Sequence, residues 1–172
     1  MIAKQLLLLR HAKSSWEDPE LADHDRPLAP RGRRAAKLIG EHLREQGIAP
    51  ELVLCSSAAR TRETLELIAP ALGEEVPVQI EDELYAASEQ VLLERVRAVE
   101  DGIESLLLIG HNPGVQQLAL LLAGSGEKVA ALARKYPTGA LATLEFSGGW
   151  RELSAGNAEL KDFVTPKQLA GR

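Results

Sequence analysis

The 172-residue sequence contains one cysteine, few aromatic residues and no long hydrophobic run. Because Cys55 is the sole cysteine, no disulfide can form within the chain, which is typical of a reducing compartment. Two tryptophans, two tyrosines and two phenylalanines offer little for stacking nucleic-acid bases, and a formal charge of −5 disfavours general nucleic-acid binding. The longest apolar run, residues 118–123, is far shorter than the roughly 20 residues that span a bilayer. These absences argue against nucleic-acid and membrane partners.

Two further features are missing from the sequence. The four-leucine run near the start is too short for the apolar region of a signal peptide, so we expect a soluble, cytoplasmic protein. Four histidines without a second cysteine and without a His-x-x-Glu-His spacing give no metal signature, so we expect no metal and no other cofactor. The length and the 45% apolar composition predict one globular domain, residues 1–172.

Short apolar runs alternate with longer helical patterns along the chain. Strands are expected at residues 6–9, 52–55, 76–80 and 106–109, and helices at 31–47, 56–73, 88–100 and 113–123. This alternation predicts an α/β fold with three layers, in which helices cover both faces of a mostly parallel central sheet. Residues 140–146 and 150–155 are expected to form a final strand pair, and the polar tail, 161–172, is expected to be loosely ordered.

Two of the expected strands end in a histidine. They read "LLLLRHAKSSW" from residue 6 and "LLLIGHNPG" from residue 106. Chemistry in open α/β sheets lies at the carboxyl ends of the strands, so His11 and His111 would face each other if their strands were neighbours. Arg10 precedes His11, and Arg60 lies in the first turn of a helix that begins at the same edge. Two guanidiniums, two imidazoles and a helix N-terminus in an acidic protein predict a phosphate site.

The expected surroundings of His11 also suit a nucleophile. Neighbouring cations disfavour an imidazolium, which would leave His11 neutral with a free lone pair near pH 7. A neutral imidazole can accept a phosphoryl group and later lose it to water, while arginines neutralise the charge on the equatorial oxygens.

Three motifs carry a resemblance to a known family. "LLLLRHAKSSW", "CSSAARTRETLELI" from residue 55 and "LLLIGHNPGV" resemble, in this order, the motifs of the histidine phosphatase superfamily, which includes the cofactor-dependent phosphoglycerate mutases. The small size, the "RPLAPRG" stretch from residue 26 and the "HNPG" turn are most similar to the SixA-type phosphohistidine phosphatases. The resemblance implies a phosphoglycerate mutase-like fold and a metal-independent phosphatase. It makes His11 the phosphorylated residue, gives phosphoryl binding to Arg10, Arg60 and His111, and gives the role of general acid to Glu83.

Some positions depart from the family pattern or have an ordinary alternative. Ala12 stands where the family motif has glycine, which indicates that the backbone there does not need a positive φ. Glu17 falls where many relatives place a phosphate-binding asparagine, and we hypothesise that Arg26 supplies the missing contact. Ser14 is a further candidate for substrate binding, although such residues after a strand are commonly plain loop. Asn112 is another candidate, with a helix cap as its alternative role. We expect structural roles for His24 and His42, and a buried strand end for Cys55.

The sequence therefore predicts a phosphatase that works through a phosphohistidine intermediate. The favoured substrate is phosphohistidine on a protein, as the SixA resemblance implies. A small-molecule phosphatase or mutase, acting on a sugar or glycerate phosphate, is the alternative enzyme, although a mutase needs a closed pocket that this short chain offers little to build. A non-catalytic module that binds phosphate or a phosphoprotein is the alternative from another functional class.

Overall fold

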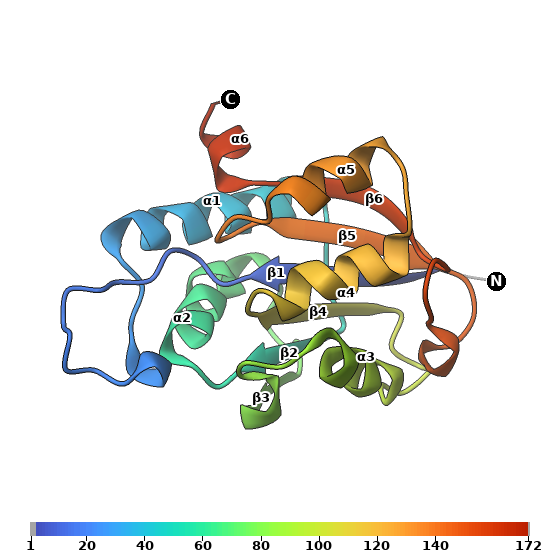
Figure 1. Ribbon diagram of the computed structural model, residues 1–172, viewed down its shortest axis with the longest axis horizontal. Coiled ribbons are helices and arrows are strands. Elements are labelled where there is room, and N and C mark those ends of the chain that lie inside the picture. The colour runs from blue at the N-terminus through green and yellow to red at the C-terminus, as the bar shows by residue number, and fades with distance from the viewer. Residues whose placement is uncertain (1–2, 172) are drawn as a thin grey trace.

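The computed structural model describes residues 3–171 and contains a six-stranded sheet in the order β3-β2-β4-β1-β5-β6 (Figure 1). Its strands are β1 (Lys4–Arg10), β2 (Leu52–Ser56), β3 (Val78–Glu81), β4 (Ser105–Gly110), β5 (Leu141–Phe146) and β6 (Glu159–Val164). The first four run parallel to one another, whereas β5 is antiparallel to both of its neighbours, β1 and β6. The expected α/β fold with a mostly parallel sheet is confirmed.

Helices lie on both faces of this sheet. They are α1 (Pro30–Glu45), α2 (Ala59–Ile68), α3 (Glu89–Arg97), α4 (Gly114–Ala123), α5 (Glu127–Arg134) and α6 (Pro166–Ala170). Leu7 and Leu9 of β1 pack into a cluster with residues of α1, α2 and α6. Leu6 and Leu8 pack into a second cluster with residues of α3, α4 and α5. Since successive strand residues point to opposite faces, the leucine run of β1 supplies both cores, as a strand buried on two sides must.

The edge strand β3 differs from the central strands. It spans Val78–Glu81 instead of the expected 76–80, and Val78 and Ile80 are 44% and 46% exposed. β3 has a strand neighbour, β2, on only one side. The β-prone sequence VPVQI at residues 76–80 thus predicts a strand here but does not predict how far it is buried.

Of the expected final strand pair, the first strand forms and the second does not. Residues 141–146 form β5, but Trp150–Glu152 is a short 3₁₀ helix, and the partner of β5 is β6. The indole of Trp150 is fully buried against Phe146, and its Nε1–H donates to the carbonyl of Ile103 at 2.7 Å, which draws this segment out of the sheet.

The C-terminal segment is ordered, in contrast to the expectation for residues 161–172. Its first residues belong to β6, and Thr165 caps α6 in a capping box with Gln168. Residue 172 lies outside the described residues. Helix α5 was not expected from the sequence, and α2 begins at Ala59 instead of 56 because Ser56 still pairs within the sheet.

Candidate active site

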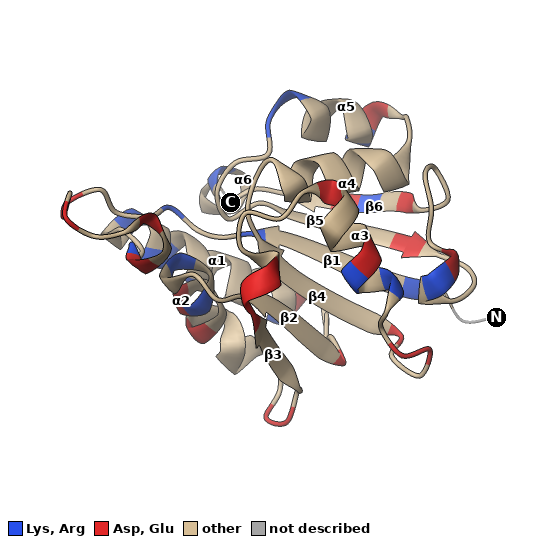
Figure 2. Cartoon of the chain, turned by 60° about the horizontal axis from the view of Figure 1, so that its bottom comes forward, with Lys and Arg blue, Asp and Glu red and all other residues tan. Residues whose placement is uncertain are grey.

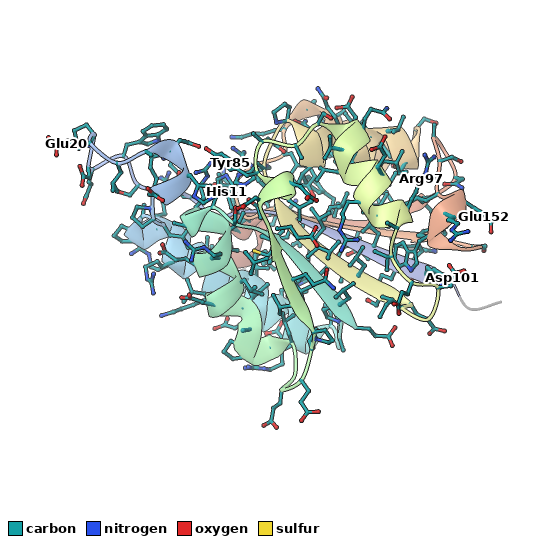
Figure 3. The ribbon with its side chains drawn as sticks, turned by 90° about the horizontal axis from the view of Figure 1, so that it is seen from below. His11, Glu20, Tyr85, Arg97, Asp101 and Glu152 are labelled. Carbon is teal, nitrogen blue, oxygen red and sulfur yellow. The ribbon has the colours of Figure 1, made fainter. Side chains whose placement is uncertain are left out.

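The two strand-end histidines lie side by side. β1 and β4 are neighbours in parallel register, with Arg10 opposite Gly110, so that His11 and His111 leave the sheet at adjacent positions. Their ring centroids are 5.2 Å apart, and both side chains are buried. The structure thus brings together the pair that the sequence predicted. Tyr85, which follows the 3₁₀ helix Asp82–Leu84, has its ring centroid 5.5 Å from that of His111, and Figure 3 labels Tyr85 and His11 in this region.

The backbone at the end of β1 is fixed by three neighbouring segments. The amide of His11 donates to Gly110, and the amide of Gly139 donates to the carbonyls of both Arg10 and His11 at 3.0 and 2.9 Å. The amide of Ala12 donates to Thr64 Oγ1 on α2 at 3.1 Å. Ala12 does not have a positive φ, as expected from the replacement of the family's glycine. These bonds set the direction in which the His11 side chain leaves the strand.

The hydrogen bond of His11 determines which ring nitrogen carries its lone pair. Nδ1 lies 2.7 Å from the carbonyl oxygen of Ala12, and because a carbonyl only accepts, Nδ1 must hold the proton. Burial lowers the pKa of His11 to about 3, with smaller contributions from His111, Arg60 and Arg10. The ring is therefore neutral at pH 7, and its lone pair is on Nε2. Burial lowers the pKa of His11 more than the neighbouring cations do, whereas the sequence alone pointed to the cations.

His111 is held in a complementary way. Its Nε2 lies 2.8 Å from Ser56 Oγ at the end of β2. Since Ser56 Oγ accepts from the amide of Ala58 at 3.4 Å, its own hydrogen can be donated to Nε2, which leaves the imidazole proton on Nδ1. Burial, followed by the charge of Arg60, lowers the pKa of His111 to about 4. Nδ1–H is then a buried donor.

The two predicted arginines add donors to this cluster. Arg10 donates from Nη1 to the carbonyl of Tyr136 at 2.9 Å, and burial, followed by the charge of Arg60, lowers the pKa of Arg10. Arg60 lies in the first turn of α2 and is buried. Within residues 3–171, the buried atoms Arg10 Nε, Arg60 Nε and His111 Nδ1 have no hydrogen-bond partner. An oxyanion with several acceptor atoms suits these donors.

Asp23 and Tyr85 complete the cluster and were missed by the sequence analysis. Arg60 donates from Nη1 to the carbonyl of Asp23 at 2.8 Å and from Nη2 to its Oδ2 at 3.0 Å. The Tyr85 hydroxyl donates to the same Oδ2 at 2.5 Å. The hydrogen bond from Tyr85, followed by those from Arg60 and Arg26, holds the pKa of Asp23 far below its usual range, so the carboxylate stays ionised. The acidic "ADHDRP" loop was the only available signal, and nothing in it indicates Arg60.

Ser14 and Arg26 lie together behind Asp23. Arg26 is buried and donates from Nη1 to Ser14 Oγ at 2.8 Å and to the carbonyl of Ser15 at 3.1 Å. Its Nε and Nη2 both contact Oδ1 of Asp23, at 3.2 and 3.1 Å. Protein acceptors thus engage Nε and both terminal nitrogens of Arg26. The structure connects Arg26 to Arg60 through Asp23, and a direct contact of Arg26 or Ser14 with substrate stays a prediction.

Glu83 and Asn112 are placed differently from the histidines. Glu83 is exposed on the 3₁₀ helix Asp82–Leu84, two residues before Tyr85. Asn112 donates to the carbonyl of Tyr136 at 3.1 Å and accepts from the amide of Gln116 at 3.3 Å, which is the helix-capping alternative considered for it. A role for Glu83 as general acid, or for Asn112 in substrate binding, stays a prediction.

Two further residues for which the sequence predicts structural roles are Cys55 and His24. Cys55 is fully buried in β2, and burial raises the pKa of its thiol to about 12, so the expected buried strand end is confirmed. His24 contacts Ser57 Oγ at 2.8 Å and the ring of Tyr85 at 4.8 Å. Within residues 3–171, no group of three histidine, cysteine or acidic residues is arranged to hold a metal ion, and no helix is long and apolar enough to cross a membrane.

Comparisons with known proteins agree with this geometry. The model of the histidine phosphatase superfamily, branch 1, matches residues 6–88, which include Arg10, His11 and Arg60. The solved structure of a putative phosphohistidine phosphatase SixA from Nakamurella multipartitia has 34% identity and a TM-score of 0.84, and the match covers 96% of this chain and 98% of that one. This chain belongs to the histidine phosphatase superfamily.

Other proteins are similar over comparable lengths. The putative phosphohistidine phosphatase SixA from Agrobacterium tumefaciens is 31% identical, with a TM-score of 0.83 and coverage of 95% of this chain and 98% of that one. An uncharacterized protein of Mycobacterium leprae is 41% identical over 92% of this chain and 100% of its own length. These matches extend past residue 88, so the likeness takes in the second histidine segment. The family model and the two SixA structures support a phosphatase with a SixA-like fold.

Proposed function

We propose that this histidine phosphatase hydrolyses phosphohistidine on a protein substrate and that His11 carries the phosphoryl group between the two half-reactions. The observation that carries the proposal is the state of His11. Its Nδ1–H is engaged by Ala12, and its pKa of about 3 keeps Nε2 unprotonated beside Arg10, Arg60 and His111. The two SixA structures that the chain resembles are described as putative phosphohistidine phosphatases, which supports the choice of substrate.

The proposed reaction has two steps at phosphorus. In the first, the lone pair of His11 Nε2 forms an N–P bond while the P–N bond to the substrate imidazole breaks, and the departing nitrogen keeps the electron pair and takes up a proton. In the second, a water oxygen attacks phosphorus, the bond to His11 breaks, and inorganic phosphate leaves with His11 regenerated. Arg10, Arg60 and Nδ1–H of His111 bind the equatorial oxygens, whose charge is stabilised without rearrangement of the site. Glu83 is the proposed source of the proton for the leaving group.

A labelling experiment tests the intermediate. Wild-type protein is incubated with phosphoramidate labelled on phosphorus and then quenched, and protein-bound label is measured before and after acid treatment. We expect acid-labile label on the wild type and none on His11→Ala, because His11 Nε2 supplies the attacking lone pair, whereas Nε2 of His111 faces the Ser56 hydroxyl. His24→Ala is the matched control, since it removes another histidine close to Tyr85 and should still acquire label.

Two further outcomes separate the candidate functions, and a third measurement tests whether the reaction needs a metal. Label on neither the wild type nor His11→Ala, with retained binding of inorganic phosphate, would leave a non-catalytic binding module. Faster turnover of sugar phosphates or phosphoglycerate than of a phosphohistidine protein would favour the small-molecule enzyme. Phosphate release should also continue at the same rate after chelation of divalent metals, because every proposed step uses protein groups and water.

A further inference from the structure

The loop of residues 15–25, between β1 and α1, carries the most exposed large hydrophobic side chain of residues 3–171. Trp16 is 71% exposed, and Leu21 in the same loop is 39% exposed. An exposed tryptophan leaves a large apolar area in water, and tryptophan is among the residues most enriched at the energetic centres of protein interfaces. The position of these two residues raises the question of what contacts them.

Trp16 is held in place although it is exposed. The guanidinium carbon of Arg26 lies 3.5 Å from the centre of the Trp16 ring, in a cation–π contact. Arg26 is buried and fixed by Ser14, Ser15 and Asp23, as described above. A side chain that is already ordered loses less conformational entropy when a partner binds. Trp16 is therefore presented as a prearranged contact surface.

The same contacts place Trp16 next to the active site. Arg26 stacks on Trp16 and binds Oδ1 of Asp23, whose Oδ2 and carbonyl bind Arg60. Trp16 is thus connected to a phosphate-binding arginine through only two intermediate residues. Figure 3 shows that the loop, with Glu20 near its outer end, extends beyond His11 and Tyr85. A molecule that contacts Trp16 while its phosphoryl group lies at His11 spans both the pocket and this loop, as the surface of a protein can.

The charges around the site indicate the chemistry of such a molecule. Glu17, Asp18 and Glu20 are exposed on the loop, and Asp82 and Glu83 are exposed on the 3₁₀ helix before Tyr85 (Figure 2). The buried floor is positive, whereas these outer groups are negative. An anionic group outside the reacting phosphoryl would be repelled, and basic side chains around it would be attracted.

We propose that residues 15–25 form a docking loop for the protein that carries the phosphohistidine. Trp16 contacts apolar surface next to the modified histidine, and Glu17, Asp18 and Glu20 pair with lysine or arginine residues that flank it. This inference rests on the proposed function, and it adds the part of the enzyme that distinguishes a protein from a small phosphorylated molecule.

The test compares three phosphohistidine substrates. They are a peptide with lysines and leucines around the phosphohistidine, a matched peptide with glutamates in place of the lysines, and the free amino acid. For the wild type we expect kcat/KM to be about tenfold higher on the lysine peptide than on the glutamate peptide. Trp16→Ala should lower kcat/KM on the lysine peptide about tenfold and leave the free amino acid unaffected. The double variant Glu17→Lys/Glu20→Lys should lose the preference between the peptides.

A control and two contrary outcomes complete the design. Val91→Ala removes another exposed apolar side chain, on α3, and should leave all three substrates unaffected. Equal rates on the two peptides, or an equal loss on the peptide and the free amino acid in Trp16→Ala, would overturn the docking loop while the proposed function stands. Failure of the wild type to hydrolyse any of the three substrates would overturn the proposed function, and the docking loop with it.

Discussion

At the level of single residues, the contacts of Asp23 fix the position of the Arg60 guanidinium. Asp23 accepts two hydrogen bonds from Arg60 through different oxygens, and the Tyr85 hydroxyl and Arg26 hold the same carboxylate from other directions. The carboxylate itself is half-exposed, so it brings one negative charge to the edge of a positive cluster. We interpret Asp23 as a positioning residue, which acts on the phosphoryl group through Arg60.

Asp23→Ala should lower kcat about tenfold without raising KM. Loss of the Oδ2 acceptor leaves Arg60 held by Asp23 only through the backbone carbonyl, so the guanidinium can move away from its transition-state position, and displacements of about 1 Å can cost up to a hundredfold in rate. Removal of the negative charge also strengthens phosphate binding, which keeps KM from rising. Steady-state kinetics with free phosphohistidine measures both constants.

The asparagine variant provides the control for this positioning role. Asp23→Asn keeps one side-chain oxygen that can accept from Arg60 Nη2, so it should recover part of the kcat lost in Asp23→Ala. A rise in KM at unchanged kcat in Asp23→Ala would contradict the positioning role, because it would indicate loss of a direct substrate contact.

Single residues also show which parts of the site can be predicted from the sequence. His11 and His111 were predicted as a pair because each follows an apolar strand, and neighbouring parallel strands end at one edge. Asp23 and Tyr85 could not be found in this way. The contacts of Asp23 with Arg60 and Tyr85 span 37 and 62 residues, and Asp23 lies in a polar stretch without periodicity. Only the tertiary structure joins them.

At the level of elements, helix α1 lies unusually close to the segment that follows His11. A Cβ atom at Gly32 would lie 2.0 Å from the carbonyl oxygen of Lys13. The amide of Ala29 donates to the same oxygen at 2.9 Å. A residue without a side chain at position 32 is thus required for α1 to pack against this segment.

Gly32→Ala should lower the free energy of unfolding by about 1–3 kcal/mol, as overpacking against backbone does. The better helix propensity of alanine, worth about 1 kcal/mol, offsets only part of this cost. Urea denaturation of both proteins measures the difference. Gly102→Ala is the matched control, because nothing lies within 4 Å of a Cβ atom there and its stability should change little. Equal stability of Gly32→Ala and the wild type would show that the segment can shift at no cost.

The elements differ in how well they could be predicted from the sequence. Strands β1, β2 and β4 are continuous apolar runs, and they form where expected. β6 was missed because its sequence, ELKDFV, carries three charged residues in its first four positions and is typical of a polar tail. It forms a strand because β5 offers it an edge, and a local sequence pattern does not contain that information.

For the molecule as a whole, two neutral histidines are buried at the carboxyl edge of the sheet. The pKa of His11 is lowered to about 3 and that of His111 to about 4, mainly by burial, from an ordinary value of 6.5. Between about pH 6.5 and pH 4, the unfolded chain therefore binds protons that the folded chain does not. Because the pKa values are lower in the folded state, the stabilisation is present above pH 6.5 and is lost as the pH falls.

The free energy of unfolding should accordingly decrease as the pH falls from 6.5 to 4. Each histidine contributes a slope of up to about 1.4 kcal/mol per pH unit in this range. His11→Gln should remove one of the two contributions, and urea denaturation at pH 7.5, 5.5 and 4.5 measures the slope. His24→Gln provides the comparison, since it removes a histidine whose side chain is only partly buried. Equal slopes for the wild type and His11→Gln would contradict the neutral, buried state of this ring.

The central place of β1 also has a consequence for how the chain folds. Its parallel partner β4 begins 100 residues later, as the pairing of Gln5 with Ser105 shows, and its antiparallel partner β5 is made later still. At a synthesis rate of about 5–20 residues per second, the four leucines emerge about 5–20 s before β4 exists to pair with them. Contacts this distant along the chain slow folding and leave apolar strand edges open to aggregation in the meantime. The strand that leads into His11 is thus the first of the six strands to be synthesised and among the last to find its neighbours.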